Sequence, residues 1–257
     1  AAFAAALDAF TKIPLDSKAY FEGLPEGIEC AREAGDHGMA ARLLEVRWRR
    51  DGGSAALLGA RLEALLRAGD GRGAVALARQ QDASFHGAVV AFGRTRGNFG
   101  PLMTAGSALL QDGESTAGLW VFELLAEAYP GDVSVLANLA LTERYLGRVE
   151  RAERHYRDAL QRAPNTAWVW NHFGLMCKGI GKCDAAADAL LRGIAVETTQ
   201  EEPTIAINLG VLFQRTGNAR GRNPVADLAA LLRRTPQAPM ARRLLLDCWH
   251  PRGAAQR

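Results

Sequence analysis

The chain has 257 residues and an apolar fraction of 48%, which is ample for a large buried core. Its 31 basic and 28 acidic residues nearly balance, and a net charge of +3 does not indicate a nucleic-acid binder. No run of about 18 apolar residues occurs, so we expect no membrane-spanning helix. The four cysteines form no C-x-x-C pair, and no His or Cys stands at zinc spacing, which excludes the usual metal-site patterns.

These thiols are typical of small buried side chains in a reducing compartment, and we therefore expect a cytoplasmic protein. An accidental bridge between Cys177 and Cys183 is the alternative, because both flank one predicted turn. The opening AAFAAALDAF has no basic leader and predicts a helix with Phe3, Leu7 and Phe10 on one side. Because the chain begins at Ala, removal of an N-terminal targeting signal from a longer protein stays open.

Three helical elements are predicted before residue 51. Pro14 ends the first helix, 1–13, and Ser17 caps a short second one that Gly23 and Pro25 interrupt. Residues 26–50 form a hairpin of two helices with a turn at 35–38.

A second hairpin and one further helix are expected before residue 99. Ser54 caps the first helix of this hairpin, and the turn lies at Gly69-Asp70-Gly71. The next segment, 82–98, predicts a single helix from Phe85 to Arg96 that Gly97-Asn98 ends. It is either an inserted helix or the point where the preceding hairpins kink.

Residues 133–166 contain the clearest unit of the chain. Two amphipathic runs are separated by Gly147 and closed by Pro164, and each places its apolar residues three and four apart. Small residues at 140, 152 and 159 permit close helix approach, and Tyr156 supplies a bulky plug. Neither helix is apolar enough to stand alone, so we expect a helical hairpin that stacks on copies of itself.

Copies of this unit lie 34 residues away on both sides. The small and turn-glycine positions recur in 99–132 and 167–202, and Pro130 repeats Pro164 in the first of these. A fourth copy, 203–236, carries Asn223-Pro224 where its second helix should begin. A proline fits there only in the first turn. The pattern resembles the tetratricopeptide repeat family: Leu then Gly or Ala at the seventh and eighth positions, a turn Gly near the fifteenth, Ala at the twentieth and twenty-seventh, an aromatic at the twenty-fourth, and Pro at the thirty-second.

This resemblance implies an all-α fold, a right-handed superhelical solenoid of stacked antiparallel helix pairs. We expect degenerate repeats over 1–98 that continue into four repeats over 99–236. An amphipathic run from Ala238 to His250 predicts a capping helix within 237–257.

No set of residues with catalytic spacing is found. The five histidines lack an H-E-x-x-H context, and no G-x-S-x-G or phosphate-binding glycine loop occurs. We therefore expect a protein that is not an enzyme and that requires no cofactor or metal.

Asn138, His172 and Asn208 occupy one position of the repeat, at intervals of 34 and 36 residues, on the first helices that line the hollow side of such a stack. An amide can pair with the main chain of an extended peptide. The row resembles the asparagine ladder of the O-linked N-acetylglucosamine transferase family at Asn138 and Asn208, whereas His172 departs from it. The alternative is that each Asn satisfies neighbouring backbone.

Four further residues are candidates for the same groove. Trp168 and Asn171 precede His172, and Arg144 and Lys178 are equivalent residues beyond the ladder position. Two cations and an aromatic ring favour a partner segment with acidic and apolar residues. Trp170, at the fourth repeat position, is the better core candidate of the two tryptophans.

The leading hypothesis is an interaction scaffold that holds a peptide or helix of a partner protein, within a larger complex or alone. The alternative is the substrate-recognition region of a larger enzyme, such as a glycosyltransferase, whose catalytic domain lies outside this chain. RNA binding by helical repeats is less favoured, because the arginines are spread over both faces.

Overall fold

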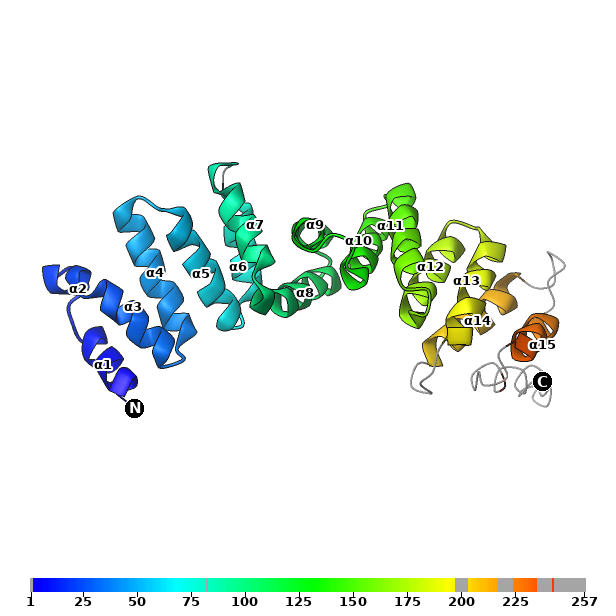
Figure 1. Cartoon of the computed structure of the whole chain (residues 1–257), viewed down its shortest axis with the longest axis horizontal. Helices are drawn as coiled ribbons and strands as arrows, with labels where there is room; N and C mark the ends of the chain where they lie inside the picture. The colour runs from blue at the N-terminus through cyan, green and yellow to red at the C-terminus, as the bar shows by residue number, and fades with distance from the viewer. Residues whose placement is uncertain (1, 82, 197–202, 217–223, 235–241, 243–257) are drawn as a thin grey trace, which may run out of the picture. The chain divides into compact units, whose positions relative to one another are not determined.

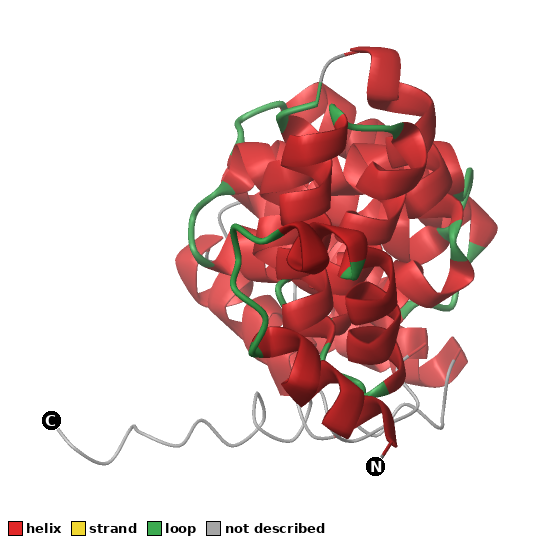
Figure 2. Cartoon of the chain, turned by 90° about the vertical axis from the view of Figure 1, so that its left-hand side faces the viewer, coloured by secondary structure: helices red, strands yellow, loops and turns green. Residues whose placement is uncertain are grey.

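The protein was studied as a computed structural model, which describes residues 2–81, 83–196, 203–216, 224–234 and 242. The described residues are helices and loops, with no strand among them (Figure 2). The prediction of an all-α fold built from helix pairs is therefore confirmed. The chain divides into two compact units, Ala1–Pro130 and Gly131–Arg257, which are described one at a time. The predicted capping helix lies outside the described residues, apart from Arg242.

Helices follow one another through short turns in both units (Figure 1). Unit 1 contains α1 Ala2–Thr11, α2 Lys18–Glu22, α3 Leu24–Glu33, α4 His37–Asp51, α5 Ala55–Arg67, α6 Gly71–Arg79, the short 3-10 turn η1 Ala83–Phe85, α7 His86–Arg94, α8 Arg96–Gln111 and α9 Ser115–Ala128. Unit 2 contains α10 Val133–Tyr145, α11 Val149–Arg162, α12 Ala167–Gly179, α13 Cys183–Val196, α14 Pro203–Thr216 and α15 Pro224–Arg234. Pro203 opens α14 and Pro224 opens α15, so each proline stands in a first helical turn.

One turn geometry recurs between the two helices of five pairs. Its glycine adopts a left-handed φ between 74° and 82°, at Gly35, Gly69, Gly113, Gly147 and Gly181. The amide after each glycine donates to the carbonyl five residues back, as Arg148 does to Glu143 at 2.8 Å. This bond satisfies a carbonyl that the end of the first helix would leave unpaired, and the left-handed φ suits glycine.

The five glycines are 34 residues apart, except for an interval of 44 between Gly69 and Gly113. The additional residues hold α7, which packs against α5, α8 and α9. Of the two alternatives for this segment, the inserted helix is therefore the one found.

The predicted end of that helix was wrong. Helix α7 ends at Arg94, and Gly97 and Asn98 lie inside the first turn of α8. Thr95 adopts an extended conformation between the two helices, with φ −65° and ψ 116°. The buried Asn98 side chain donates to the carbonyl of Phe92 at 3.0 Å, so this residue joins the two helices and does not terminate one.

Helix starts in unit 1 follow the predicted caps. The hydroxyl of Ser17 accepts from the amide of Tyr20 at 3.1 Å, and that of Ser54 accepts from Leu57 at 3.2 Å. Each bond satisfies an amide that the first turn leaves free.

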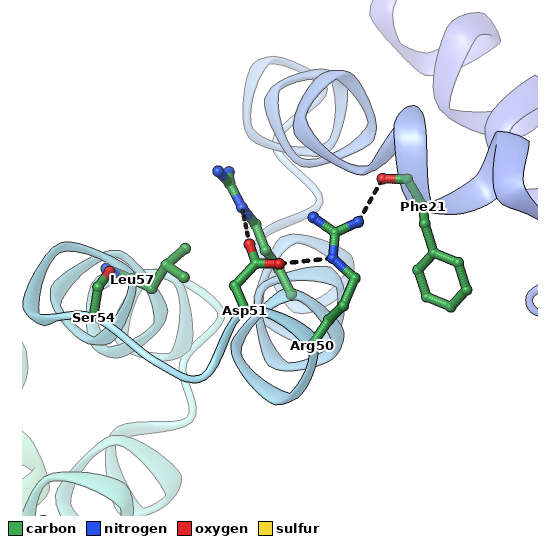
Figure 3. Close-up of polar contacts among 6 residues, drawn as sticks. Phe21, Arg50, Asp51, Ser54 and Leu57 are labelled. Carbon is green, nitrogen blue, oxygen red and sulfur yellow. Dashed lines mark hydrogen bonds and ion pairs between the residues drawn. The ribbon is translucent and has the colours of Figure 1, made fainter.

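The end of α4 is tied to α2 through one arginine, as Figure 3 shows. Arg50 Nη1 donates to the Phe21 carbonyl at 2.8 Å, and Arg50 Nε donates to Asp51 Oδ1 at 2.7 Å. Hydrogen bonds from Arg50 and Arg47 hold the pKa of Asp51 below its usual value, although this carboxylate is exposed. The contact orders the short α2 against the second helix of the next pair.

Close packing of a small residue against a large one joins the helices of each later pair. A side-chain carbon added to Gly106 would lie 2.8 Å from the Phe122 ring, and one on Gly174 would lie 2.8 Å from Leu190. In the pair α10–α11 the equivalent residues are Ala140 and Tyr156, and both are fully buried. The predicted roles of the small residues and of Tyr156 are confirmed. Phe3, expected beside Leu7 and Phe10, is instead 47% exposed, since α1 begins there.

Two glycine substitutions should change stability in opposite directions. Gly147→Ala places a side chain at φ 74°, and we expect it to lower the free energy of unfolding by about 1 kcal/mol. Gly59 lies inside α5 with no atom within 4 Å of an added side-chain carbon. Gly59→Ala should therefore raise the free energy of unfolding by about 0.5–1 kcal/mol, because alanine has the higher helix propensity. Urea unfolding followed by circular dichroism measures both, and a loss at position 59 would contradict the helix assignment.

Candidate functional site

The candidate site lies on the first helices of three successive pairs in unit 2. Asn138 belongs to α10, His172 to α12 and Asn208 to α14, and α12 packs against both other helices. Each of the three side chains is partly exposed. The arrangement therefore places one polar group of each helix at the same repeat position.

Asn138 uses part of its bonding capacity within its own helix. Its Nδ2 donates to the carbonyl of Ser134 at 2.8 Å, and the Thr142 hydroxyl donates to the Asn138 carbonyl at 2.7 Å. The side-chain oxygen of Asn138 has no hydrogen-bond partner within the described part of the chain. The backbone contact named as the alternative exists, and it leaves an acceptor free.

Asn208 and Asn171 are brought together by the packing of α14 on α12. Asn208 Nδ2 donates to Asn171 Oδ1 at 2.9 Å, and Asn171 is only 5% exposed. This bond positions the Asn208 amide, whose oxygen also has no partner among the described residues. Ligand contact by Asn171 stays a prediction, and its main contact here is with Asn208.

His172 is held edge-on against Trp168, with ring centroids 6.0 Å apart. Its Nδ1 is enclosed and has no hydrogen-bond partner. Burial lowers the pKa of His172 below its ordinary value, and the positive charge of Arg144 lowers it further. The imidazole is therefore neutral at physiological pH.

Arg144 and Lys178 occupy equivalent places near the ends of α10 and α12. The Arg144 guanidinium lies 5.1 Å from the ring centroid of Tyr145, which is 57% exposed. Neither cation forms an ion pair with another described residue, so their charges are available to a ligand.

Trp170 is an anchor within the repeat. Its Nε1 donates to the carbonyl of Pro164 at 2.7 Å, and Arg192 lies 5.2 Å from its ring centroid. Both Trp168 and Trp170 are partly buried against the core of unit 2. Trp170 was expected to be the better core candidate, but both rings are half-buried. They differ in their contacts, because Trp168 touches the ladder histidine and Trp170 touches the preceding turn.

A buried charge cluster was not predicted. Glu143 in α10 is 0% exposed, and its carboxylate lies 2.7 Å from Arg151 Nε and 2.7 Å from His155 Nδ1, both in α11. The available signal was a charged residue within the apolar stripe of residues 136 to 146. Its partners could not be chosen from the sequence, because pairing depends on how the two helices face each other.

Unit 1 contains hollows of its own, to which the sequence assigned no site. Three adjoining hollows of about 430, 280 and 490 Å³ lie along α3, α5 and α7. Arg32 and Ala60 line all three.

Metal sites, disulfide bonds and membrane-spanning helices are absent from the described residues. No group of three or more His, Cys, Asp or Glu side chains in the described ranges could hold a metal ion. Cys177 and Cys183 are separate free thiols, so the bridge considered above is not formed. Among the helices described, none combines the length and the apolar character that crossing a membrane requires.

Known proteins with a similar sequence or fold give a second kind of evidence. No family model matches the sequence. Over 118 residues the chain is 25% identical to Tetratricopeptide repeat protein 8 of Caenorhabditis elegans, which covers 45% of this chain. The match spans only 23% of that relative's own length.

Among solved structures, the C-terminal part of a TPR repeat-containing protein from Cytophaga hutchinsonii has a TM-score of 0.51 with this chain. The match covers 95% of this chain and 94% of the other at 15% identity. The chain folds as a tetratricopeptide repeat (TPR) protein. The TPR domain of Sgt2 from Aspergillus fumigatus is also similar, with a TM-score of 0.44 at 19% identity over 47% of this chain and 80% of that one.

Two substitutions in the α10–α11 pair should separate a buried hydroxyl without a partner from a buried carboxylate that is ion-paired. The Tyr156 hydroxyl is enclosed without a partner, and burial raises its pKa well above the usual range. Tyr156→Phe keeps the ring and should leave the free energy of unfolding unchanged or raise it by up to about 1 kcal/mol.

Glu143→Gln removes the carboxylate that contacts Arg151 and His155. It should lower the free energy of unfolding by about 1–3 kcal/mol, since both partners can still reach water. Urea unfolding of both variants beside the wild type is the measurement. A Tyr156→Phe protein as unstable as Glu143→Gln would show that the hydroxyl has a partner.

Proposed function

We propose that this chain is a non-enzymatic interaction scaffold, and that the first helices of unit 2 bind an extended segment of a partner protein. One observation carries the proposal: unused bonding groups stand together on α10, α12 and α14. They are the amide oxygens of Asn138 and Asn208, the exposed side of His172 and the unpaired charges of Arg144 and Lys178. Water could satisfy each of these groups alone. Because they recur at one repeat position, they favour a ligand that runs across the helices.

The charges on this face define the partner's chemistry. Two cations without carboxylate partners attract acidic side chains, while Trp168 and Tyr145 provide apolar and aromatic contact area. The preferred segment is therefore extended, with at least one Asp or Glu near an apolar residue. The cytoplasm remains the compartment we propose.

The distribution of arginines supports a protein ligand over RNA. Several are paired with carboxylates one turn away on their own helix, among them Arg49 with Glu45, Arg67 with Glu63 and Arg157 with Glu153. An arginine already paired with a carboxylate neutralises a phosphate less effectively. It therefore releases fewer counterions from RNA and contributes less binding free energy.

An affinity capture with paired variants tests the ladder. We expect the double variant Asn138→Ala, Asn208→Ala to lose partners that the wild type retains, because each amide lost leaves a peptide group unpaired at about 1–3 kcal/mol. Gln161→Ala, an exposed amide on α11, is the matched control and should behave as wild type. Melting curves accompany the assay, since Asn208→Ala also removes the bond to Asn171. Equal capture by all three proteins would place the binding surface elsewhere.

Charge reversal tests the preference for acidic segments. Arg144→Glu with Lys178→Glu should weaken binding of a captured partner segment by about tenfold in 150 mM salt, since each exposed pair contributes up to about 1 kcal/mol. Arg154→Glu, an exposed cation on α11, should have little effect. Isothermal calorimetry measures the three affinities, and an Arg154 effect as large as that of the pair would indicate only long-range attraction.

A further inference from the structure

We infer that His172 is a neutral hydrogen-bond donor to a carbonyl oxygen of the bound segment, flanked by two amide oxygens that accept from that segment's N–H groups. This inference rests on the proposed function and specifies what the ligand must offer. It assigns the middle of the row a donor alone, whereas each neighbour also has a free acceptor.

The position of the imidazole hydrogen follows from burial. Nδ1 is enclosed, and no acceptor of the described residues forms a hydrogen bond with it. A buried N–H without an acceptor is rarer in proteins than an unused acceptor, so the hydrogen belongs on Nε2. Nε2 has no partner among the described residues and is not enclosed. It is the donor that His172 presents at the surface.

The neutral state follows from the neighbours of the ring. The edge-on contact with Trp168 removes water from one side, and Arg144 of α10 adds a positive charge nearby. Both disfavour the imidazolium form. The carboxylate of Glu143 in α10 does not compensate, because the Arg151 guanidinium already pairs with it at 2.7 Å.

The two flanking asparagines keep a group that His172 lacks. One N–H of Asn138 Nδ2 is bound to the Ser134 carbonyl and one N–H of Asn208 Nδ2 to Asn171 Oδ1, and each side-chain oxygen is left as an acceptor beside the second N–H. Along α10, α12 and α14, acceptors therefore remain at the two outer positions and only a donor at the middle one.

The spacing of packed helices selects the ligand conformation. Neighbouring helix axes lie about 8–10 Å apart, and a polyproline II chain advances about 9.3 Å per turn of three residues. Such a chain presents the same face to each helix, at residues i, i+3 and i+6. The segment must offer a carbonyl at i+3, where the row can only donate. Proline is thus permitted at i+3.

The free protein supplies the first test. Long-range ¹H–¹⁵N correlation spectra of the imidazoles, recorded between pH 7.5 and 5.5, identify the tautomer, and the signal absent from His172→Gln assigns it. We expect the Nε2–H form with a pKa below the ordinary histidine value near 6.5. An Nδ1–H form, or a pKa above 6.5, would overturn the inference without the need for any ligand.

Binding supplies the second test, with 12-residue peptides selected on the whole chain from a phage-displayed random library. For peptides that depend on Asn138 and Asn208, His172→Phe keeps the ring packing and should weaken binding about tenfold. His172→Gln retains a donor near the place of Nε2 and should stay within about threefold. Wild-type affinity should not rise as the pH falls from 7.5 to 6.5.

Each outcome separates the two proposals. Equal binding by His172→Phe, or an affinity that rises as the pH falls through 6.5, refutes the neutral donor while the groove remains. A library that yields only peptides indifferent to Asn138→Ala, Asn208→Ala refutes the groove itself, and with it the role of His172 in binding.

Discussion

The whole architecture depends on one backbone turn. Its glycine has a left-handed φ, and the amide that follows closes the end of the first helix by bonding five residues back. Because this turn fixes the direction in which the second helix leaves, repeating it at 34-residue intervals repeats the orientation of every pair. The interval of 44 between Gly69 and Gly113 is absorbed by α7, which leaves the turns before and after it unchanged.

The close contact between helices explains which side of each first helix remains free for a ligand. Gly106, Ala140 and Gly174 let the second helix approach until Phe122, Tyr156 and Leu190 fill the space between the pair. Residues two positions earlier on the same helices, such as Asn138 and His172, point elsewhere because two residues correspond to about 200° of helix rotation. The packing that stabilises each pair therefore also determines the direction of the polar row.

The sequence predicted what one helix pair determines by itself. Turn glycines, serine caps and the buried small residues depend on contacts within about 34 residues, so their spacing identified them. The end of α7 was missed because Gly97-Asn98 has the composition of a helix terminator, whereas the buried bond from Asn98 to Phe92 makes it a junction. The pairing of Glu143 with Arg151 and His155, and of Asn208 with Asn171, depends on the mutual rotation of separate helices. The residue periodicity of a single helix does not contain that rotation, so the sequence could not predict these pairs.

The same distinction applies to the candidate site. Residue type alone makes Asn138 and Asn208 equivalent groups with both donors and acceptors, and it makes His172 an exception to the ladder. In the folded chain one N–H of each amide is already bound to protein, whereas the free nitrogen of His172 faces outward. What a polar side chain offers a ligand is the bonding capacity left after packing, and here an acceptor remains at the two asparagines but not at His172. A row of three identical amides would accept a peptide in several registers. A row whose middle member can only donate admits fewer, because a shift of the chain places an N–H of the ligand against that donor, and unpaired polar groups in a contact cost more than lost contacts.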